Sequence, residues 1–219
     1  MSDAIETVER EAMEYDVVIV GAGPSGLSAA IRLKQLAEAA GTEVSVAVLE
    51  KGSEVGAHIL SGAVIDPKGI DELLPNWKEL GIPLETKVTR DKFVILGPNG
   101  DLDISWLPFP KWMLNHGNYI ASLGNVCRSL AQHAEALGVE IYPGMAASEV
   151  VYNEDGSVKG VVAGVFGIDK DGNQTADYQP GIELHAKYTF IGEGVRGSLA
   201  KQLQARFGLT NDQIGRAHV

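Results

Sequence analysis

The feature that most constrains this chain is a glycine-rich turn between an apolar run and a helical pattern. Residues 15–20 form a short, nearly all-apolar run, typical of a strand buried on both faces of a parallel sheet. The turn at 21–26 follows at once, and apolar residues then recur at helical spacing over 27–40. A second apolar run at 44–49 ends in Glu50. This order predicts one complete β-α-β unit of a dinucleotide-binding domain.

The three glycines of this turn, Gly21, Gly23 and Gly26, form the pattern G-x-G-x-x-G. Gly21 permits the tight turn, Gly23 has no side chain to hold a pyrophosphate away, and Gly26 lets the helix pack on the strand. The N–H groups at the helix N-terminus then face the phosphates. The Glu50 carboxylate suits a ribose diol and would repel a 2′-phosphate, which predicts FAD or NAD and not NADP. The alternative is a structural glycine turn beside a solvated glutamate.

A second loop with glycines, Gly56-Ala-His-Ile-Leu-Ser-Gly62, comes directly after this unit. Small residues let a backbone approach a flat ring system, and Ser61 or His58 can hydrogen-bond a flavin. The alternative is an ordinary loop in which His58 is a satisfied polar residue. The residues alone leave both interpretations open.

A third turn, Gly192-Glu-Gly194, ends a predicted buried strand at 188–191 and precedes a predicted helix at 198–207. It indicates another close approach of the backbone to a ligand, with Glu193 placed to meet hydroxyl groups. The alternative is a plain strand-to-helix turn. Other strands are expected at 88–96 and 102–104 around Asn99-Gly100, at 158–166, and separately at 182–186.

An aromatic segment at 106–114 interrupts the regular pattern. Pro108 and Pro110 exclude a helix or a central strand there. Such a cluster either folds back as core, which composition alone favours, or enters a bilayer interface, where tryptophan prefers to lie. Lys111 would suit a lipid headgroup. The side chains concerned are Trp106, Leu107, Phe109, Trp112, Met113 and Leu114.

Charge and cysteine content narrow the function classes. The chain has 219 residues with 18 basic and 29 acidic side chains, a net charge of −11, which disfavours nucleic acid as a partner. Cys127 is the single cysteine, so no intrachain disulfide is possible. One thiol cannot hold an iron–sulfur cluster or a cysteine-type zinc site, and no metal ligands are expected in this sequence. The acidic N-terminus does not read as a targeting peptide, and the chain is expected in a bacterial cytoplasm or on the membrane facing it.

Taken together, these segments resemble the electron-transfer flavoprotein–ubiquinone oxidoreductase family. The resemblance runs from about residue 14 to 209, and its central stretches are more specific than the glycine motif. Gly192 stands where the family usually has alanine. The matching stretches are 17–30, 32–36, 50–51, 56–63, 66–67, 76–81, 115–119, 134–144, 155–160, 184–187, 193–194 and 199–203.

The resemblance implies a flavoenzyme that takes electrons from reduced electron-transfer flavoprotein and passes them to ubiquinone. It implies FAD, a 4Fe-4S cluster held by a C-terminal domain that this chain lacks, and a monotopic position on the cytoplasmic face of a bacterial inner membrane. It favours the membrane interpretation of the aromatic segment over the core interpretation. The FAD contacts it implies, together with those argued above, are Gly21, Gly23, Pro24, Ser25, Gly26, Glu50, Lys51, His58, Ser61, Gly62, Glu193 and Gly194.

The expected fold class is α/β with an α+β portion. It is a Rossmann-like FAD-binding domain of the two-dinucleotide-binding flavoprotein type, with part of an inserted β-rich quinone and membrane-contact region. The expected division is a disordered acidic tail at 1–13, FAD-binding domain at 14–85 and 117–209, quinone and membrane-contact region at 86–116, and a non-native or disordered end at 210–219.

The resemblance also leaves rival functions. A related flavoenzyme, such as a geranylgeranyl reductase or a nitrogen-fixation quinone reductase, shares the FAD-binding segments. A non-catalytic nucleotide-binding fragment is the second rival, because the family's cluster ligands and the closing FAD contact are absent. The sequence predicts a truncated N-terminal part that is inactive alone; its last residues, 214–219, match no part of the family sequence and match instead a translated sequencing adapter.

Overall fold

The computed structural model describes residues 10–60, 62–170 and 172–209, and the chain divides into two compact units. The first unit joins the segments before residue 59 and after residue 129, and the second is the segment between them. These boundaries follow contacts within the fold. The division by function at 85/86 and 116/117 stays a prediction.

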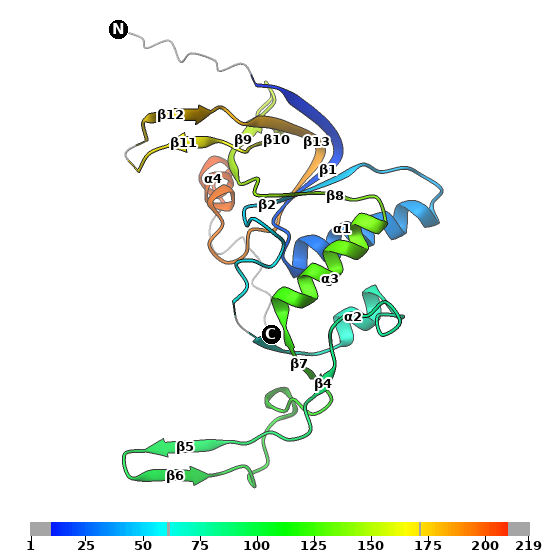
Figure 1. Ribbon diagram of the computed structural model, residues 1–219, viewed down its shortest axis with the longest axis vertical. Coiled ribbons are helices and arrows are strands. Elements are labelled where there is room, and N and C mark those ends of the chain that lie inside the picture. The colour runs from blue at the N-terminus through cyan, green and yellow to red at the C-terminus, as the bar shows by residue number, and fades with distance from the viewer. Residues whose placement is uncertain (1–9, 61, 171, 210–219) are drawn as a thin grey trace. The chain divides into compact units, whose positions relative to one another are not determined.

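The first unit is built around a six-stranded sheet (Figure 1). In sheet order its strands are β8 (Glu140–Pro143), β2 (Val46–Glu50), β1 (Ala12–Val20), β13 (Ile182–Ile191), β10 (Val158–Ala163) and β9 (Ala147–Tyr152). The first four run parallel, whereas β10 is antiparallel to both β13 and β9. A parallel sheet with a glycine turn after β1 confirms the predicted Rossmann-like class.

Helix α1 (Pro24–Ala39) packs on one face of this sheet, and α4 (Ser198–Phe207) lies beside β9. The apolar stripe of α1 is fully buried at Leu27 and Ile31, against strand residues such as Ile19 that are equally inaccessible. Each such side chain contributes about 1.5–3 kcal/mol of transfer free energy. A two-stranded hairpin, β11 (Phe166–Ile168) and β12 (Gln174–Gln179), belongs to the same unit.

The second unit contains two small antiparallel sheets. One is β3 (Gly62–Ile65), β7 (Tyr119–Ser122) and β4 (Thr86–Lys87), and the other is the hairpin β5 (Val94–Gly97) and β6 (Gly100–Asp103). Helix α2 (Lys68–Leu73) and the short 3₁₀ helix η1 (Lys111–Met113) complete it, and α3 (Leu123–Ala136) continues from this unit into the first. Its small core is organised by Trp77 against the edge of Tyr119, with ring centroids 5.6 Å apart.

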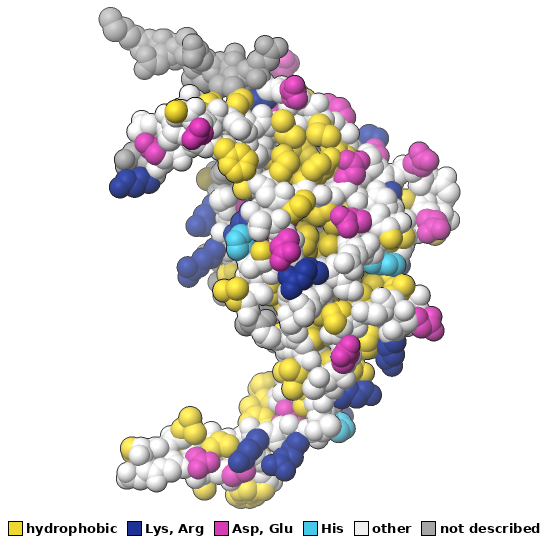
Figure 2. Space-filling model, viewed as in Figure 1, with side chains coloured by type: hydrophobic (Ala, Val, Ile, Leu, Met, Phe, Trp, Pro, Cys, Tyr) yellow, Lys and Arg dark blue, Asp and Glu magenta, His cyan; other side chains and the backbone are white. Residues whose placement is uncertain are grey.

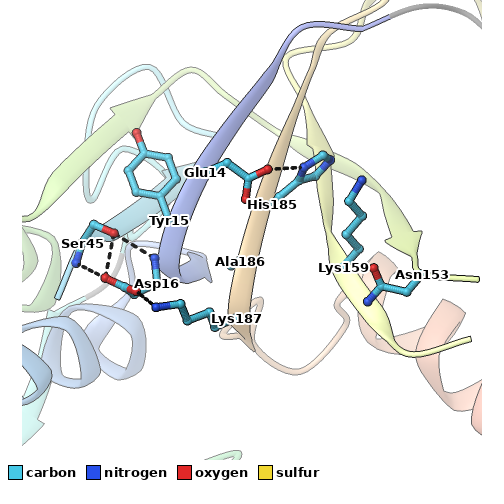
Figure 3. Close-up of a pocket in the computed structure, with 9 residues that line it drawn as sticks. All are labelled: Glu14, Tyr15, Asp16, Ser45, Asn153, Lys159, His185, Ala186 and Lys187. Carbon is cyan, nitrogen blue, oxygen red and sulfur yellow. Dashed lines mark hydrogen bonds and ion pairs between the residues drawn. The ribbon is translucent and has the colours of Figure 1, made fainter. Parts of the chain in front are cut away.

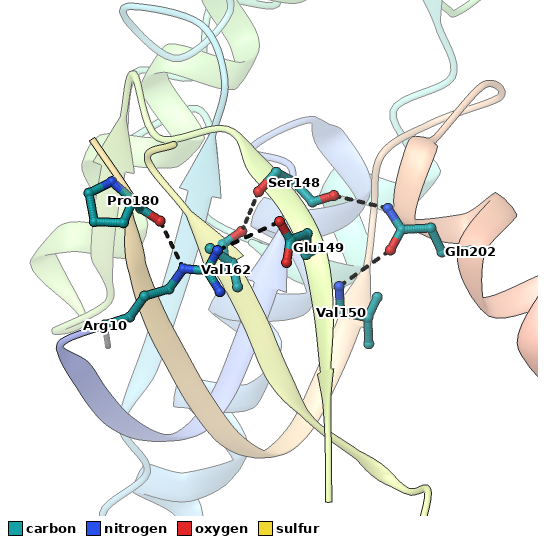
Figure 4. Close-up of polar contacts among 7 residues, drawn as sticks. All are labelled: Arg10, Ser148, Glu149, Val150, Val162, Pro180 and Gln202. Atoms are coloured by element: carbon teal, nitrogen blue, oxygen red, sulfur yellow. Dashed lines mark hydrogen bonds and ion pairs between the residues drawn. The ribbon is translucent and has the colours of Figure 1, made fainter. Parts of the chain in front are cut away.

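Two side chains fasten elements to the β9–β10–β13 part of the sheet (Figure 4). Gln202 of α4 donates from Nε2 to the Ser148 carbonyl at 2.9 Å and accepts from the Val150 amide at 3.4 Å, so its amide replaces a neighbouring strand along the outer edge of β9. Arg10 donates from Nε to the Pro180 carbonyl at 2.9 Å and lies 3.7 Å from the Glu149 carboxylate.

The structure changes several expected boundaries. Strand β1 begins at Ala12 rather than at 15, because Arg10 and the first half of β13 hold this segment. The strand expected over 158–166 ends at Ala163, since Gly164 has a φ of +73° that breaks the ladder. The hairpin around Asn99-Gly100 is confirmed, but its first strand starts at Val94 and not at 88.

Two strands expected to be separate, at 182–186 and 188–191, are one continuous strand, β13. Its first half pairs with both β1 and β10, and its second half pairs with β1. The expectation of a buried strand at 188–191 is wrong for the described structure, since Tyr188 is 75% exposed and Phe190 40% exposed.

Candidate functional site

The candidate site lies where three parallel strands end. Gly21 follows β1, Glu50 ends β2, and Gly192 follows β13, and these strands are neighbours in the sheet. The Gly21 amide donates to the Leu49 carbonyl and the Gly192 amide donates to the Val20 carbonyl, both at 2.8 Å. The sequence-predicted turns after β1 and β13 are therefore brought side by side at the carboxyl edge, where open α/β sheets bind their ligands.

Two of the three motif glycines are required by the protein itself. Gly21 has a φ of +106°, and a Cβ added there would come within 2.4 Å of the Gly192 carbonyl oxygen. A Cβ on Gly26 would come within 2.0 Å of the Gly21 carbonyl oxygen and 3.1 Å of the Ile19 methyl group Cγ2. Both positions thus need glycine for backbone conformation or for the approach of α1 to β1.

Gly23 differs from its two neighbours in the motif. It is the N-cap of α1 with φ −81° and ψ −178°, an extended conformation open to any residue. A Cβ added to Gly23 would meet no described atom within 4 Å. No described atom of the chain therefore requires glycine at this position.

The N-terminus of α1 is available to an anion. Gly23 makes no side-chain cap, Pro24 occupies the first helical turn, and that turn contains no acidic residue. Ser25 and Gly26 follow within the same turn. The partial positive charge of a 16-residue helix therefore faces the open space at Gly23 without a carboxylate of its own to offset it.

Glu50 is held toward the glycine turn. Its carboxylate accepts from the Ala22 amide at 3.2 Å and from the Gly52 amide at 2.7 Å, and its side chain is 13% exposed. A carboxylate offers about four acceptor positions, so two remain for other donors. Ala22 and Gly52 were missed in the sequence because both act through backbone N–H groups.

The Glu193 carboxylate accepts hydrogen bonds from backbone amides at the start of α4. Its Oε1 accepts from the Ser198 and Leu199 amides at 3.1 and 3.3 Å, and its Oε2 accepts from the Ala200 amide at 3.0 Å. This arrangement caps the N-terminus of α4, a role that the sequence did not suggest. Gly194, the next residue, has a φ of +80°. The ligand contacts expected for Glu193 and Gly194 stay predictions.

The structure describes only part of the second glycine-containing loop, which runs from Gly56 to Gly62. Lys51 is exposed, and His58 Nδ1 lies 4.0 Å from Glu50 Oε1 with its side chain 60% exposed. Ser61 lies outside the described residues, and Gly62 begins β3 in the second unit. The structure thus places His58 beside Glu50, and the flavin contacts of His58, Ser61 and Gly62 stay predictions.

The aromatic segment is largely exposed in the second unit. Trp106 and Trp112 are 79% and 83% exposed, and Leu107 and Leu114 are exposed as well. Phe109 is half-buried because it stacks on Phe93, with ring centroids 3.9 Å apart, and Met113 is half-buried too. Figure 2 shows further apolar side chains on the β5–β6 hairpin, at the bottom of the view, where Ile95, Leu96 and Leu102 are exposed.

A polar hollow of about 440 Å³ lies elsewhere, beside the middle of β1 and β13 (Figure 3). Lys187 Nζ lies 2.6 Å from Asp16 Oδ1, and the Ser45 amide donates to Asp16 Oδ2 at 2.8 Å. His185 lies between Glu14 and Glu183, at 2.8 and 2.7 Å. Since dinucleotides bind at the carboxyl ends of the strands, this hollow is not part of the candidate site.

Residues 10–60, 62–170 and 172–209 contain neither a helix suited to span a membrane nor a cluster of metal ligands. No helix there has the length and apolar character needed to cross a bilayer. No group of three or more histidine, cysteine, aspartate or glutamate side chains in those segments is arranged to hold a metal ion.

Comparisons with known proteins agree with this geometry. Residues 19–77, from β1 through the glycine turn and Glu50, match the NAD(P)-binding Rossmann-like domain family. A myxobacterial FAD-dependent halogenase, CndH, superposes with a TM-score of 0.59 at 16% identity, covering 86% of this chain and 39% of its own. A geranylgeranyl bacteriochlorophyll reductase-like protein from Thermoplasma acidophilum gives 0.57 at 18% identity, covering 94% and 44%. The fold of this chain is therefore that of a Rossmann-like domain.

Sequence relatives are more specific. The Pseudomonas aeruginosa electron transfer flavoprotein-ubiquinone oxidoreductase is 57% identical over 207 residues, which are 94% of this chain and 38% of the relative. The human mitochondrial protein of the same name is 53% identical over 202 residues, 92% of this chain and 33% of its own length. This chain is a homologue of the electron transfer flavoprotein-ubiquinone oxidoreductases, as its sequence predicted, and it spans about a third of their length.

Proposed function

We propose that this chain binds FAD and represents the FAD-binding part of an enzyme that passes electrons from reduced electron-transfer flavoprotein to ubiquinone at a membrane surface. Relatives at 53–57% identity carry the corresponding name. The observation that carries the proposal is Gly23, a motif glycine that no described atom of the protein requires. An open position in front of an uncapped helix N-terminus suits a pyrophosphate.

The residues present fit an FAD molecule. The backbone at Gly23, Pro24 and Ser25 would hold the pyrophosphate against the α1 N-terminus, and Glu50 would accept the adenosine ribose hydroxyls on its two remaining acceptor positions. The Ala22 and Gly52 amides keep that carboxylate oriented. When bound, FAD supplies the redox chemistry, while this chain supplies binding and orientation.

The preference for FAD over a dinucleotide with a 2′-phosphate is tested by titration. Fluorescence titration of the purified chain should show FAD binding at least about tenfold more tightly than NADP, since the Glu50 charge opposes a 2′-phosphate. Preference for NADP over FAD would contradict the site as assigned. A chain that binds no dinucleotide would contradict the proposal itself.

Electron transfer to quinone is proposed for the full-length protein and not for this chain alone. The relatives are roughly three times as long, and the described residues contain no group of ligands for a metal cluster. Purified chain is therefore expected to reduce ubiquinone no faster than its Gly23→Asp variant, in which a carboxylate would repel the pyrophosphate. Quinone reduction by the chain clearly above that control would refute the proposed inactivity.

Membrane contact is the proposed role of the aromatic segment. Trp106 and Trp112 are among the most exposed apolar side chains of the described residues, and Lys111 is exposed between them. Tryptophan at the surface with a neighbouring cation suits the interface of an anionic bilayer. The half-buried stack of Phe109 on Phe93 would fix the segment to its unit.

Vesicle sedimentation tests this role. We expect the chain to bind vesicles of phosphatidylethanolamine and phosphatidylglycerol, and the double variant Trp106→Ser with Trp112→Ser to bind about tenfold more weakly. Phe166→Ser, which removes an exposed aromatic ring from the other unit, is the matched control. Equal binding by the double variant, or an equal loss in the control, would argue against the assignment.

A further inference from the structure

The hairpin formed by β5 and β6 turns at the dipeptide Asn99-Gly100 (Figure 1). Gly97 is paired with Gly100, so Pro98 and Asn99 make up the turn between the strands. Within the described part of the chain the two strands pair only with each other, and each of their residues except Val94 is exposed. A two-stranded hairpin of this kind is at best marginally stable in water, so its turn opens readily.

Asn99 differs from the other asparagines in two respects. Its side chain is exposed, and no described residue forms a hydrogen bond with it. In contrast, the Asn115 amide donates to Asp91 at 2.8 Å and the Asn153 amide donates to Ser157 at 2.9 Å. Asn99 is also followed by glycine, a pair that occurs once in the sequence.

The glycine that follows makes a specific reaction of the asparagine side chain accessible. Deamidation begins when the backbone nitrogen of the next residue reaches the carbonyl carbon of the asparagine side chain. A side chain on that next residue hinders the approach, whereas glycine has none and a freer backbone. At Gly100 the surroundings are open as well, because an added Cβ would meet nothing within 4 Å.

We infer that Asn99 is a site of spontaneous deamidation, with water as the co-reactant. The Gly100 nitrogen bonds to the Asn99 carbon Cγ, the bond from Cγ to Nδ2 breaks, and the proton of the Gly100 nitrogen passes through solvent to the departing ammonia. Water then opens the five-membered imide to aspartate or isoaspartate at position 99. One water enters, one ammonia leaves, and no electrons are transferred.

A similar turn elsewhere in the chain is protected by its contacts. Asp155-Gly156 lies between β9 and β10, and Asp155 Oδ1 accepts from the hydroxyl and the amide of Ser157 at 2.6 and 2.9 Å. These hydrogen bonds, the hydroxyl first, lower the pKa of Asp155 and keep its carboxylate ionised. An ionised carboxylate does not react with a backbone nitrogen, so the reaction is expected at Asn99 and not at this turn.

Deamidation would change the charge of the hairpin tip. The hairpin exposes Ile95, Leu96 and Leu102, and its acids are Asp101 and Asp103. A third carboxylate at the tip would be repelled by an anionic bilayer. This consequence rests on the proposed membrane contact of the region, whereas the reaction itself does not.

Peptide mass spectrometry tests the reaction. The chain would be incubated in mildly alkaline buffer and digested with trypsin, which releases residues 93–111 with Asn99 as their sole asparagine. We expect this fragment to gain about 1 Da, at a rate within about threefold of that in a free synthetic peptide of residues 96–102. The rate is read on molecules in which Cys127, which is fully buried, stays unreactive toward a thiol reagent.

Asn99→Gln is the matched control and should show no gain, because a glutamine side chain must close a larger ring. A reaction more than about tenfold slower in the folded chain than in the free peptide would overturn the inference. An equally fast gain at Asn115 or Asn153 would also overturn it, since those side chains are bonded.

Vesicle sedimentation tests the effect of the charge. Asn99→Asp should bind vesicles of phosphatidylethanolamine and phosphatidylglycerol about fivefold more weakly than Asn99→Gln, and the two should bind phosphatidylcholine vesicles equally. Equal binding of both variants to the anionic vesicles would overturn this effect. If neither variant nor the unaltered chain binds any vesicle, the proposed membrane contact is wrong, and the mass measurement still decides the reaction.

Discussion

The carboxylate oxygen Oε2 of Glu50 lies 3.2 Å from the amide nitrogen of Ala22, so the acid that ends β2 is hydrogen-bonded to the glycine turn that ends β1. In the proposed FAD site, this contact joins the residue that would accept the ribose hydroxyls to the turn that would hold the pyrophosphate. It also keeps the Glu50 side chain largely buried before any ligand arrives.

Glu50→Gln should therefore weaken FAD binding. The amide keeps one acceptor oxygen but loses the charge that strengthens hydrogen bonds from ribose hydroxyls, a change of about 1.5 kcal/mol or roughly tenfold in the dissociation constant. Titration of FAD with Glu72→Gln, an exposed acid on α2, serves as the control. An unaltered FAD affinity in Glu50→Gln would remove Glu50 from the site.

Glu193→Gln separates the two roles open to this residue. As the cap of α4 the carboxylate accepts from three backbone amides, and its loss should cost about 1 kcal/mol of unfolding free energy. Urea unfolding should show this cost whether or not FAD is present. A variant of full stability with weakened FAD binding would instead assign Glu193 to the ligand.

Gln202→Ala should loosen α4 and expose the outer edge of β9. Two hydrogen bonds to Ser148 and Val150 disappear, which costs about 1 kcal/mol, and the freed edge can pair with another molecule. Sedimentation velocity should therefore show more self-association than for Lys201→Ala, an exposed neighbour on the same helix. Identical behaviour of the two variants would mean that Gln202 does not protect β9.

Acid sensitivity should trace partly to Asp16. Its hydrogen bond with Lys187, followed by those with Ser45, lowers its pKa from 3.8 to about 2. Because the folded pKa is the lower one, this carboxylate stabilises the fold above pH 3.8, and the contribution is lost as pH falls toward 2. Asp16→Asn should flatten the dependence of the unfolding midpoint on pH between these values.

Lys187→Met checks the cause of that pKa change. Removing the ammonium group takes away the largest source of the lowered Asp16 pKa, so the pH dependence should shrink in this variant too. An unchanged pH profile in both variants would show that the Asp16–Lys187 pair contributes nothing measurable in solution.

The sequence predicts the β-α-β unit well because every signal there is local. Each signal lies within the strand or turn that it predicts. The signals are the apolar run before Gly21, the spacing of the glycines and the acid at position 50. The carboxyl-edge position of Gly192 was also predictable, since it follows an apolar strand and precedes a helix.

The parts that could not be predicted depend on distant partners. Glu193 caps α4 and Gln202 bonds to the outer edge of β9, and both side chains bind backbone groups. No residue pattern in the sequence indicates such contacts. The burial expected for residues 188–191 failed for a different reason. The pattern describes a strand with neighbours on both sides, and the described structure supplies a neighbour on one.

The most direct test of the central claim compares Gly23→Ala with Gly69→Ala. At both positions an added Cβ meets nothing within 4 Å and the backbone is not left-handed, so neither change creates a steric clash. We predict that Gly23→Ala weakens FAD binding by about tenfold or more in a direct titration, while Gly69→Ala leaves it unchanged. Equal FAD affinity in the two variants would contradict the assignment of the Gly23 turn as the pyrophosphate site.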